Sequence, residues 1–188
     1  LAAIAVAIGF LAFLLVNLTL QGVGAFTTNT ITVPVYVDPA RVDARDLQGA
    51  NYDMLVADQL LARLGVENDE LGENSLKAKD LLSPDLGYQV LDRLKVDPSL
   101  IGRTITVSAP VAGNADLYYK GELGREISQE DRKLDDQQLE WLDKLKAAGL
   151  VTSGFNTRLF THADSTQPEL AGLLGAIVGS ALMLLVTA

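Results

Sequence analysis

The two ends of the chain carry no charged residue, because every Asp, Glu, Lys and Arg lies between Asp38 and Glu169. At the N-terminal end, residues 1–20 are apolar except for one Gly, one Asn and one Thr. A helix rises about 1.5 Å per residue, so this run is long enough to cross a hydrocarbon core of about 30 Å. We predict a transmembrane helix over residues 1–21. The alternative is a cleaved signal peptide, whose apolar part is shorter, about 7 to 15 residues, and follows basic residues.

The C-terminal end is a second uncharged apolar run, and we expect a second transmembrane helix to start within residues 169–188. Small residues recur in it about every four positions, which would give one smooth helix face. Such a face lets another membrane helix approach closely, although glycine is also generally common in membrane helices. We predict a helix-packing role for Ala171, Gly172, Gly175 and Gly179.

Between the two runs, residues 22–168 change pattern and alternate between strand and helix periods. Residues 30–37 place Ile and Val on one face and polar residues on the other, which predicts a strand, and Pro34 predicts that this strand lies at a sheet edge. The same alternation predicts a strand over residues 104–109. Weaker signals, mainly aromatic residues, predict two further strands, over residues 116–120 and 155–161.

Helical spacing of apolar residues predicts four helices in the same region. The clearest one begins at Asp135, a suitable N-cap with Gln138 three residues later, the arrangement of a capping box. The fold class we predict is an α+β extracytoplasmic domain flanked by two transmembrane α-helices. The predicted helices cover residues 51–64, closed by Gly65, then 75–82, 84–97 and 135–148, closed by Gly149.

Charge and composition exclude several functions. The chain has 15 basic and 24 acidic residues, a net charge of −9, so we expect no nucleic-acid binding. It has no Cys, one His and none of the nucleophile, P-loop or zinc-protease motifs, so we expect neither enzymatic activity nor a cofactor. The chain also starts without Met inside an apolar run, and we expect it to be a piece of a longer protein.

A few residues are candidates for more specific roles. Asp135 and Asp136 form a carboxylate pair, which a helix cap explains better than acid–base chemistry. Residues 67–70 are acidic but lack the ligand spacing of a calcium loop, so a solvated loop is the better interpretation. His162 is expected at the surface or in the linker. The candidate partner contacts are aromatic, although Trp141 also fits a core anchor: Trp141, Tyr118 and Tyr119.

Four segments carry a resemblance to a known family: ANYDMLVADQL, DPSLIGRTITV, DRKLDDQQLEWLDKLKAAGLV and FNTRLFTHADSTQPELAGLLGAIVGS. Together they resemble the N-terminal part of PstA-type permeases of the phosphate ABC transporter, in the subgroup with a domain inserted between the first two membrane helices. The resemblance implies an inner-membrane protein with a periplasmic insert over residues 22–168 and the start of the permease core at 169–188. It also implies four kinds of partner: a second permease subunit, ATP-binding subunits that hydrolyse the ATP, a periplasmic phosphate-binding protein and membrane lipid.

The sequence leaves two function classes open. One is the permease subunit, whose insert would dock other transporter components. The other is a sensor domain between two membrane helices of a receptor-type signalling protein, which would be followed by a charged signalling module. In either case the acidic domain should repel phosphate at long range, because Arg41 and Arg45 are surrounded by Asp38, Asp43 and Asp46. We therefore expect the insert to act by protein contact.

Overall fold

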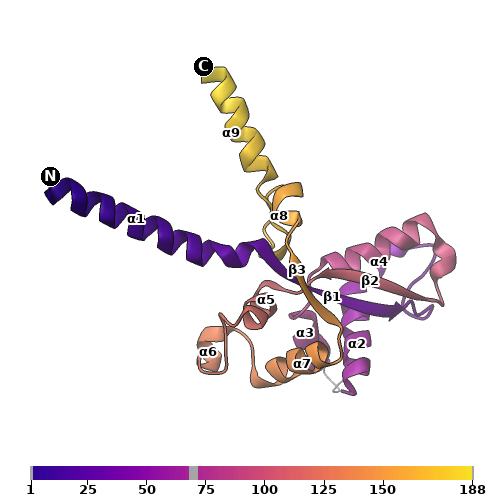
Figure 1. Ribbon diagram of the computed structural model, residues 1–188. Helices are drawn as coiled ribbons and strands as arrows, with labels where there is room; N and C mark the ends of the chain where they lie inside the picture. Colours follow the sequence, from indigo (N-terminus) through magenta and orange to yellow (C-terminus); the bar gives the residue numbers. More distant parts are fainter. Residues whose placement is uncertain (1, 68–71, 188) are drawn as a thin grey trace. The chain divides into compact units, whose positions relative to one another are not determined.

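The computed structural model describes residues 2–67 and 72–187, which form two compact units. The first unit joins the two ends of the chain, Leu1–Thr28 and Gly154–Ala188. The second is the central segment Asn29–Ser153, which contains the hydrophobic core. Figure 1 shows the elements of both units in chain order. We describe each unit by itself.

The sheet has three strands in the order β2-β1-β3. Strand β1 (Thr27–Tyr36) is central and runs antiparallel to β2 (Thr104–Pro110), with pairs from Thr30↔Pro110 to Tyr36↔Thr104. Strand β3 (Val151–Phe155) follows on the other side, where Thr32 N donates to Leu150 O over 2.9 Å. The alternating segments at 30–37 and 104–109 are thus confirmed as strands.

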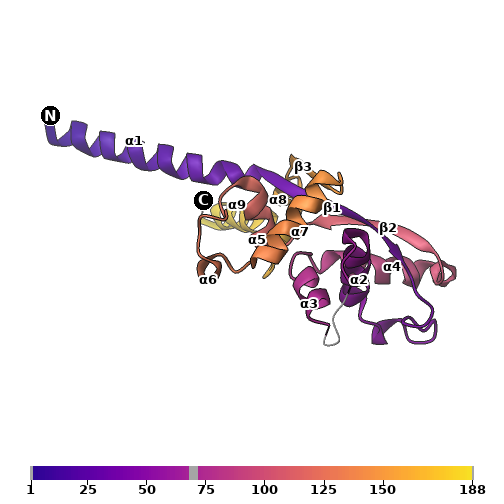
Figure 2. The ribbon, with the colours of Figure 1, turned by 90° about the horizontal axis from the view of Figure 1, so that it is seen from below.

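One face of the sheet is covered by helices, and the other faces solvent with Thr and Ser side chains. The buried face of β1 carries Ile31, Val33 and Val35, none of which is exposed. Figure 2 shows α2 (Tyr52–Leu64), α3 (Glu73–Lys79) and α4 (Asp85–Val96) on the same side of β1 and β2. Apolar and polar residues alternate along a strand in this way when helices cover only one face of the sheet.

The expected helices of the central unit are present. Helix α2 is capped by Asn51, whose Oδ1 accepts from Met54 N over 3.1 Å, and ends at Gly65 with φ +66°. Helix α7 (Asp136–Ala147) begins with the predicted capping box of Asp135 and Gln138. The capping residues predict the helix ends correctly because they pair with backbone groups that have no partner within the helix. The unit also contains α5 (Gly113–Lys120) and the short α6 (Gln129–Arg132).

The predicted strand over residues 116–120 is wrong, because this segment is helix α5. Its two tyrosines favour a strand, but Lys120 pairs with Asp116 one turn earlier at 2.5 Å, and Gly121 ends the helix with φ +76°. Tyrosine's weak preference for strands is overridden by these helical contacts.

The predicted strand over residues 155–161 is also wrong beyond its first residue. The chain turns at Asn156, whose Nδ2 donates to Ala25 O and whose Oδ1 accepts from Leu159 N, and helix α8 (Arg158–Thr161) follows. The aromatic residues stack instead of alternating: Phe160 lies 6.0 Å from Phe155 and 6.2 Å from Phe26 between ring centroids.

Pro34 does not mark an edge strand, because β1 is the central strand of the sheet. Strand β3 covers only the first part of β1: it begins at Val151, and the preceding Leu150 pairs with Thr32. Pro34 lies past that point, where β1 has β2 as its neighbour, and it pairs there with Thr106. Its missing N–H therefore leaves no ladder bond unmade, which is the reason a proline is tolerated.

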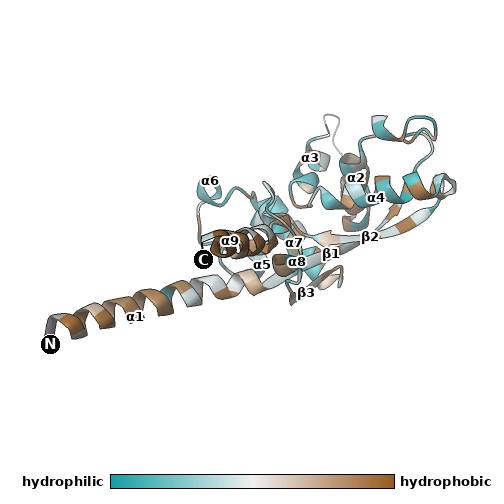
Figure 3. Cartoon of the chain, turned by 90° about the horizontal axis from the view of Figure 1, so that it is seen from above, coloured by the Kyte–Doolittle hydropathy of each residue, from teal (hydrophilic) through white to brown (hydrophobic). Residues whose placement is uncertain are grey.

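In the other unit, helix α1 (Ala2–Gly22) is followed by the 3₁₀ helix η1 (Val23–Phe26). Within the described residues one helical span, Val6–Phe26, is long and apolar enough to cross a membrane, and none of it is buried. Helix α9 (Leu174–Thr187) is also apolar but has 14 residues, and it begins later than residue 169 because the 3₁₀ helix η4 (Pro168–Leu170) and a turn come first. Figure 3 shows the apolar character of α1 and α9.

Candidate functional site

The small residues of the C-terminal run have two different environments. Gly175 and Gly179 lie in α9, and apart from the helix's own backbone no atom of the described residues comes within 4 Å of the position that a Cβ would take at either. Ala171 and Gly172 precede the helix, so they do not belong to a helical face, contrary to the predicted seam. At Gly172 a Cβ would overlap the backbone oxygen of His162 and lie 2.7 Å from that of Arg158. Gly172 therefore allows close contact within the chain itself.

The aromatic candidates hold the central unit together. Trp141 is 2% exposed and lies in the core, so its burial overturns the predicted partner contact and confirms the core anchor. Tyr119 donates to Leu142 O and Tyr118 donates to Asp143 Oδ1, each over 2.8 Å, which fastens α5 to α7. Burial raises the pKa of the Tyr119 hydroxyl far above its usual range. Tyr118 and Tyr119 are both half-buried, with their hydroxyls already bonded inside the unit.

The charged candidates show no catalytic arrangement. Asp135 caps α7, and its carboxylate also pairs with Lys77 at 2.8 Å, while Asp136 pairs with the buried Arg132. The described residues contain no group of three side chains that could hold a metal ion. Of the acidic loop 67–70, residues 68–70 lie outside the described residues. His162 is exposed, with its Nδ1 2.9 Å from Thr161 Oγ1.

A polar network lies where the central unit begins and ends. The backbone N and the Nδ2 of Asn29 both donate to Asp116 Oδ1 over 2.9 Å, and Ser153 Oγ donates to Asn29 Oδ1 over 2.6 Å. Lys120 pairs with the second oxygen of Asp116 at 2.5 Å. The network thus joins β1, α5 and β3 at the first and last residues of the unit.

A groove of about 490 Å³ lies on the central unit, and we call it the Asp53 groove. It lies between the loop before α2, the first turn of α2 and the middle of α4. Tyr88 is 62% exposed in the groove, whereas Tyr52 is 7% exposed and donates to Leu47 O over 2.6 Å. The lining residues are Gln48, Gly49, Ala50, Asn51, Tyr52, Asp53, Gly87, Tyr88 and Leu91.

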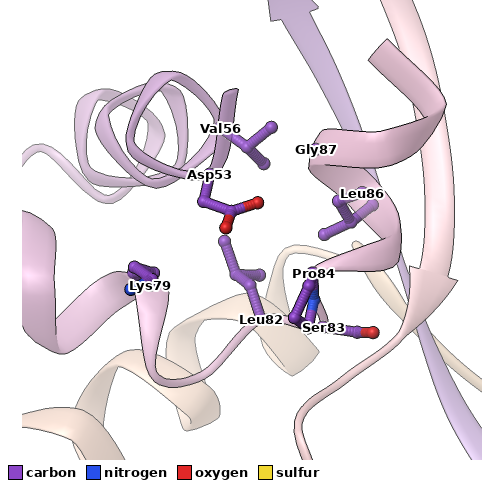
Figure 4. A pocket seen from close by; sticks show the side chains of 8 residues that line it. All are labelled: Asp53, Val56, Lys79, Leu82, Ser83, Pro84, Leu86 and Gly87. Carbon is purple, nitrogen blue, oxygen red and sulfur yellow. The ribbon is translucent and has the colours of Figure 1, made fainter. Parts of the chain in front are cut away.

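Asp53 is the charged residue of this groove, and it also lines a narrow recess of about 20 Å³ behind it. Figure 4 shows its carboxylate turned into the recess, among Val56, Leu82 and Leu86. Burial raises the pKa of Asp53, and the nearby charge of Lys79 lowers it by less. Across residues 2–67 and 72–187, no hydrogen bond or ion pair reaches this carboxylate.

Gly87 makes room for the Asp53 side chain. A Cβ at Gly87 would overlap Asp53 Oδ1 and lie 3.2 Å from Asp53 N. Gly87 occupies the buried face of an amphipathic helix, where alanine would favour the helix by about 1 kcal/mol. The sequence predicts helices through Tyr52 and Leu91 but assigns no site role to any residue that lines the Asp53 groove; a glycine within a helical stripe is the available signal.

Comparison with known proteins gives one match. A family model described as a domain of unknown function, DUF3333, matches residues 1–129. No curated protein and no solved structure matches the chain. The matched segment covers helix α1, the groove and helix α5.

Proposed function

Because the chain belongs to the DUF3333 family of domains of unknown function, we propose its role from its own residues: it is the N-terminal part of a PstA-type permease subunit for ATP-driven phosphate import. In this proposal the central unit is a periplasmic α+β insert that docks other transporter components. Membrane helices precede and follow the insert. The support is the resemblance of the four sequence segments together with the physical arguments below.

The observation that carries the proposal is the exposed apolar surface of the helices at both ends. In α1, Phe10, Phe13 and Leu18 are between 62% and 64% exposed, and in α9, Leu185 is 75% exposed. Apolar surface left in water costs about 25 cal/mol for each Å², so helices of this composition require lipid or other membrane helices around them. The acidic unit between them has a closed core of its own, which fits a domain that stands outside the bilayer.

The insert acts through protein contact. Residues 22–168 contain all 15 basic residues and 23 of the 24 acidic residues, all but Glu169, so their net charge is 15 − 23 = −8. Arg41, one of the two basic residues that we considered for anion capture, is paired with Asp58 at 2.5 Å. A divalent anion is repelled by such a unit unless several arginines converge on it. Tight phosphate binding is therefore assigned to a separate periplasmic phosphate-binding protein.

The other partners follow from the same assignment. A second permease subunit would pack against the small-residue face of α9 at Gly175 and Gly179, where a close approach is open. ATP hydrolysis belongs to separate ATP-binding subunits, so this chain is not itself an enzyme. The location is the bacterial inner membrane.

The test is phosphate uptake. The complete protein and its partner subunits are expressed in cells whose own phosphate uptake has been removed, and entry of radiolabelled phosphate is measured. The proposal expects uptake that needs ATP and stops when this subunit is left out. Uptake that is unchanged without the subunit contradicts the proposal, and a charged signalling module following the second membrane helix would favour the receptor class instead.

A further inference from the structure

We propose that the Asp53 groove binds an arginine-bearing segment of a partner protein, with the guanidinium held in the groove beside Asp53 and Tyr88. The inference rests on the proposed docking role of the insert and names the chemistry of the partner. Three features of the groove carry it: its charge, its aromatic rim and its size.

The groove lining carries one charged side chain, the carboxylate of Asp53, whose charge the nearby Lys79 offsets in part. Asp53 is half-buried, and its carboxylate accepts no hydrogen bond from the described residues. Asp46 adds a second carboxylate beside the loop before α2, where its Oδ1 accepts from Gly49 N over 3.1 Å. Lys79 lines the recess behind Asp53, but it is exposed and no ion pair joins the two among residues 2–67 and 72–187. A half-buried carboxylate without a donor is costly, and an incoming cation removes that cost.

The aromatic rim favours arginine over a simple cation. Tyr88 is 62% exposed, which is unusual for a large aromatic side chain on a helix whose other face is buried. A guanidinium is planar, so it can stack on a tyrosine ring and at the same time donate two hydrogen bonds to a carboxylate. The ammonium of lysine has the charge but lacks this flat geometry.

The size of the groove fits part of a protein chain. Its volume of about 490 Å³ exceeds what one guanidinium fills, and the remaining lining is apolar or amide: Leu91, Ala50 and Gln48. Neighbouring residues of a peptide segment would occupy this space. Gly87 keeps the floor open, because any side chain there would meet the Asp53 carboxylate.

The test is a titration of the full chain in detergent micelles, followed by the backbone amide NMR signals of Gly49 and Gly87. The probe is the tripeptide Ac-Ala-Arg-Ala-NH₂, and its control is the same peptide with citrulline, which has the shape of arginine without the charge. We expect saturable, millimolar shifts with the arginine peptide. The affinity should fall at least about tenfold with the citrulline peptide or with Asp53→Asn, since both remove the charge pair.

Two further variants make the test specific. Glu122→Gln removes one charge from an exposed carboxylate on a turn outside the groove, and it should leave the affinity unchanged within about twofold. Gly87→Ala should abolish the shifts by displacing the Asp53 carboxylate. Equal affinity for both peptides, or an arginine response that survives Asp53→Asn, would overturn the inference. These results do not depend on phosphate uptake, so the inference and the proposed function fail separately.

Discussion

Gly87 of α4 faces Asp53 of α2 so closely that the glycine cannot carry a side chain while the carboxylate keeps its place. The contact joins the two helices that border the Asp53 groove. Glycine weakens a helix, here in the first turn of α4, and a half-buried charged group without a hydrogen-bond donor weakens the fold, so each residue by itself lowers stability. Together they leave an open, negatively charged groove on the surface of the unit.

This relationship predicts a non-additive pair of substitutions. Gly87→Ala should gain less than about 1 kcal/mol of unfolding free energy in the native background, because the new methyl group displaces Asp53. In an Asp53→Ala background the same substitution should give a larger gain, still below about 1 kcal/mol because the new Cβ would lie 3.2 Å from the backbone N of residue 53. Chemical denaturation in micelles measures both, with the fluorescence of Trp141, the single tryptophan, as the probe of the core. Equal gains in the two backgrounds would show that the residues are independent.

The polar network around Asn29 and Asp116 predicts that two substitutions of Asp116 lower the stability of the unit by different amounts. Asp116→Ala removes the acceptor of both Asn29 donors and the partner of Lys120, so it should cost about 2–3 kcal/mol. Asp116→Asn keeps an acceptor oxygen and loses the charge pair, and it should cost about 1 kcal/mol. The same denaturation experiment measures both variants. A loss from Asp116→Asn as large as that from Asp116→Ala would mean that the ion pair, and not the hydrogen bonds, holds the junction.

Much of the fold follows from the sequence where a pattern is local. The alternation at 30–37, the capping box at Asp135 and the terminal Gly65 each specify backbone geometry within a few residues, and each is found as expected. At residues 116–120 and 155–161 tyrosine and phenylalanine predict strands, but helix capping and contacts with other elements favour the helices α5 and α8 instead.

The candidate site was much less accessible to sequence reasoning. The Asp53 groove depends on residues near 50 and near 88 meeting across two helices, and no periodicity reports such a meeting. The aromatic residues that suggested partner contacts pack inside the unit instead: Trp141 fills the core, and Tyr118 and Tyr119 bond to α7. Pro34 does not tell whether β1 lies at the edge of the sheet. It is tolerated in the central strand because the neighbouring strand β3 is too short to reach it.

The segment before α9 predicts that Gly172 and Gly175 respond differently to substitution by alanine. Gly172→Ala should destabilise the turn, because the new Cβ would meet backbone oxygens of His162 and Arg158, which cannot move as a side chain could. Gly175→Ala meets nothing within 4 Å and should favour the helix. Amide hydrogen exchange of residues 158–174 in micelles reports the difference as faster exchange for Gly172→Ala alone. Unchanged exchange in that variant would contradict the close contact.

Two carboxyl groups should titrate on opposite sides of the ordinary value of 3.8. Burial raises the pKa of Asp53, whereas hydrogen bonds from Ser99 lower the pKa of Asp97. The contribution of Asp97 to stability is therefore present above its unfolded pKa and is lost as the pH falls through its lower folded value. Ionised Asp53 instead destabilises the fold: this penalty is absent below its unfolded pKa and grows as the pH rises through its raised folded value.

NMR titration of the side-chain carboxyl carbons measures both midpoints. As the pH rises from about 3 to about 7, Asp53→Asn should become more stable than the native chain, and Asp97→Asn should become less stable than the native chain. An Asp53 midpoint at or below that of Asp97 would contradict the burial of Asp53.

The side of the membrane on which the central unit stands tests the account most directly, since docking to periplasmic partners requires the outer side. The chain has no Cys, so Val96→Cys, at a position that is 87% exposed, provides one reporter thiol in this part of the protein, and the complete protein without the substitution gives the background labelling. A membrane-impermeant maleimide is added to right-side-out and to inside-out membrane vesicles containing the complete protein. The account predicts labelling in the right-side-out vesicles and none in the inside-out vesicles until detergent is added. Labelling in the inside-out vesicles alone would place the unit in the cytoplasm and contradict the account.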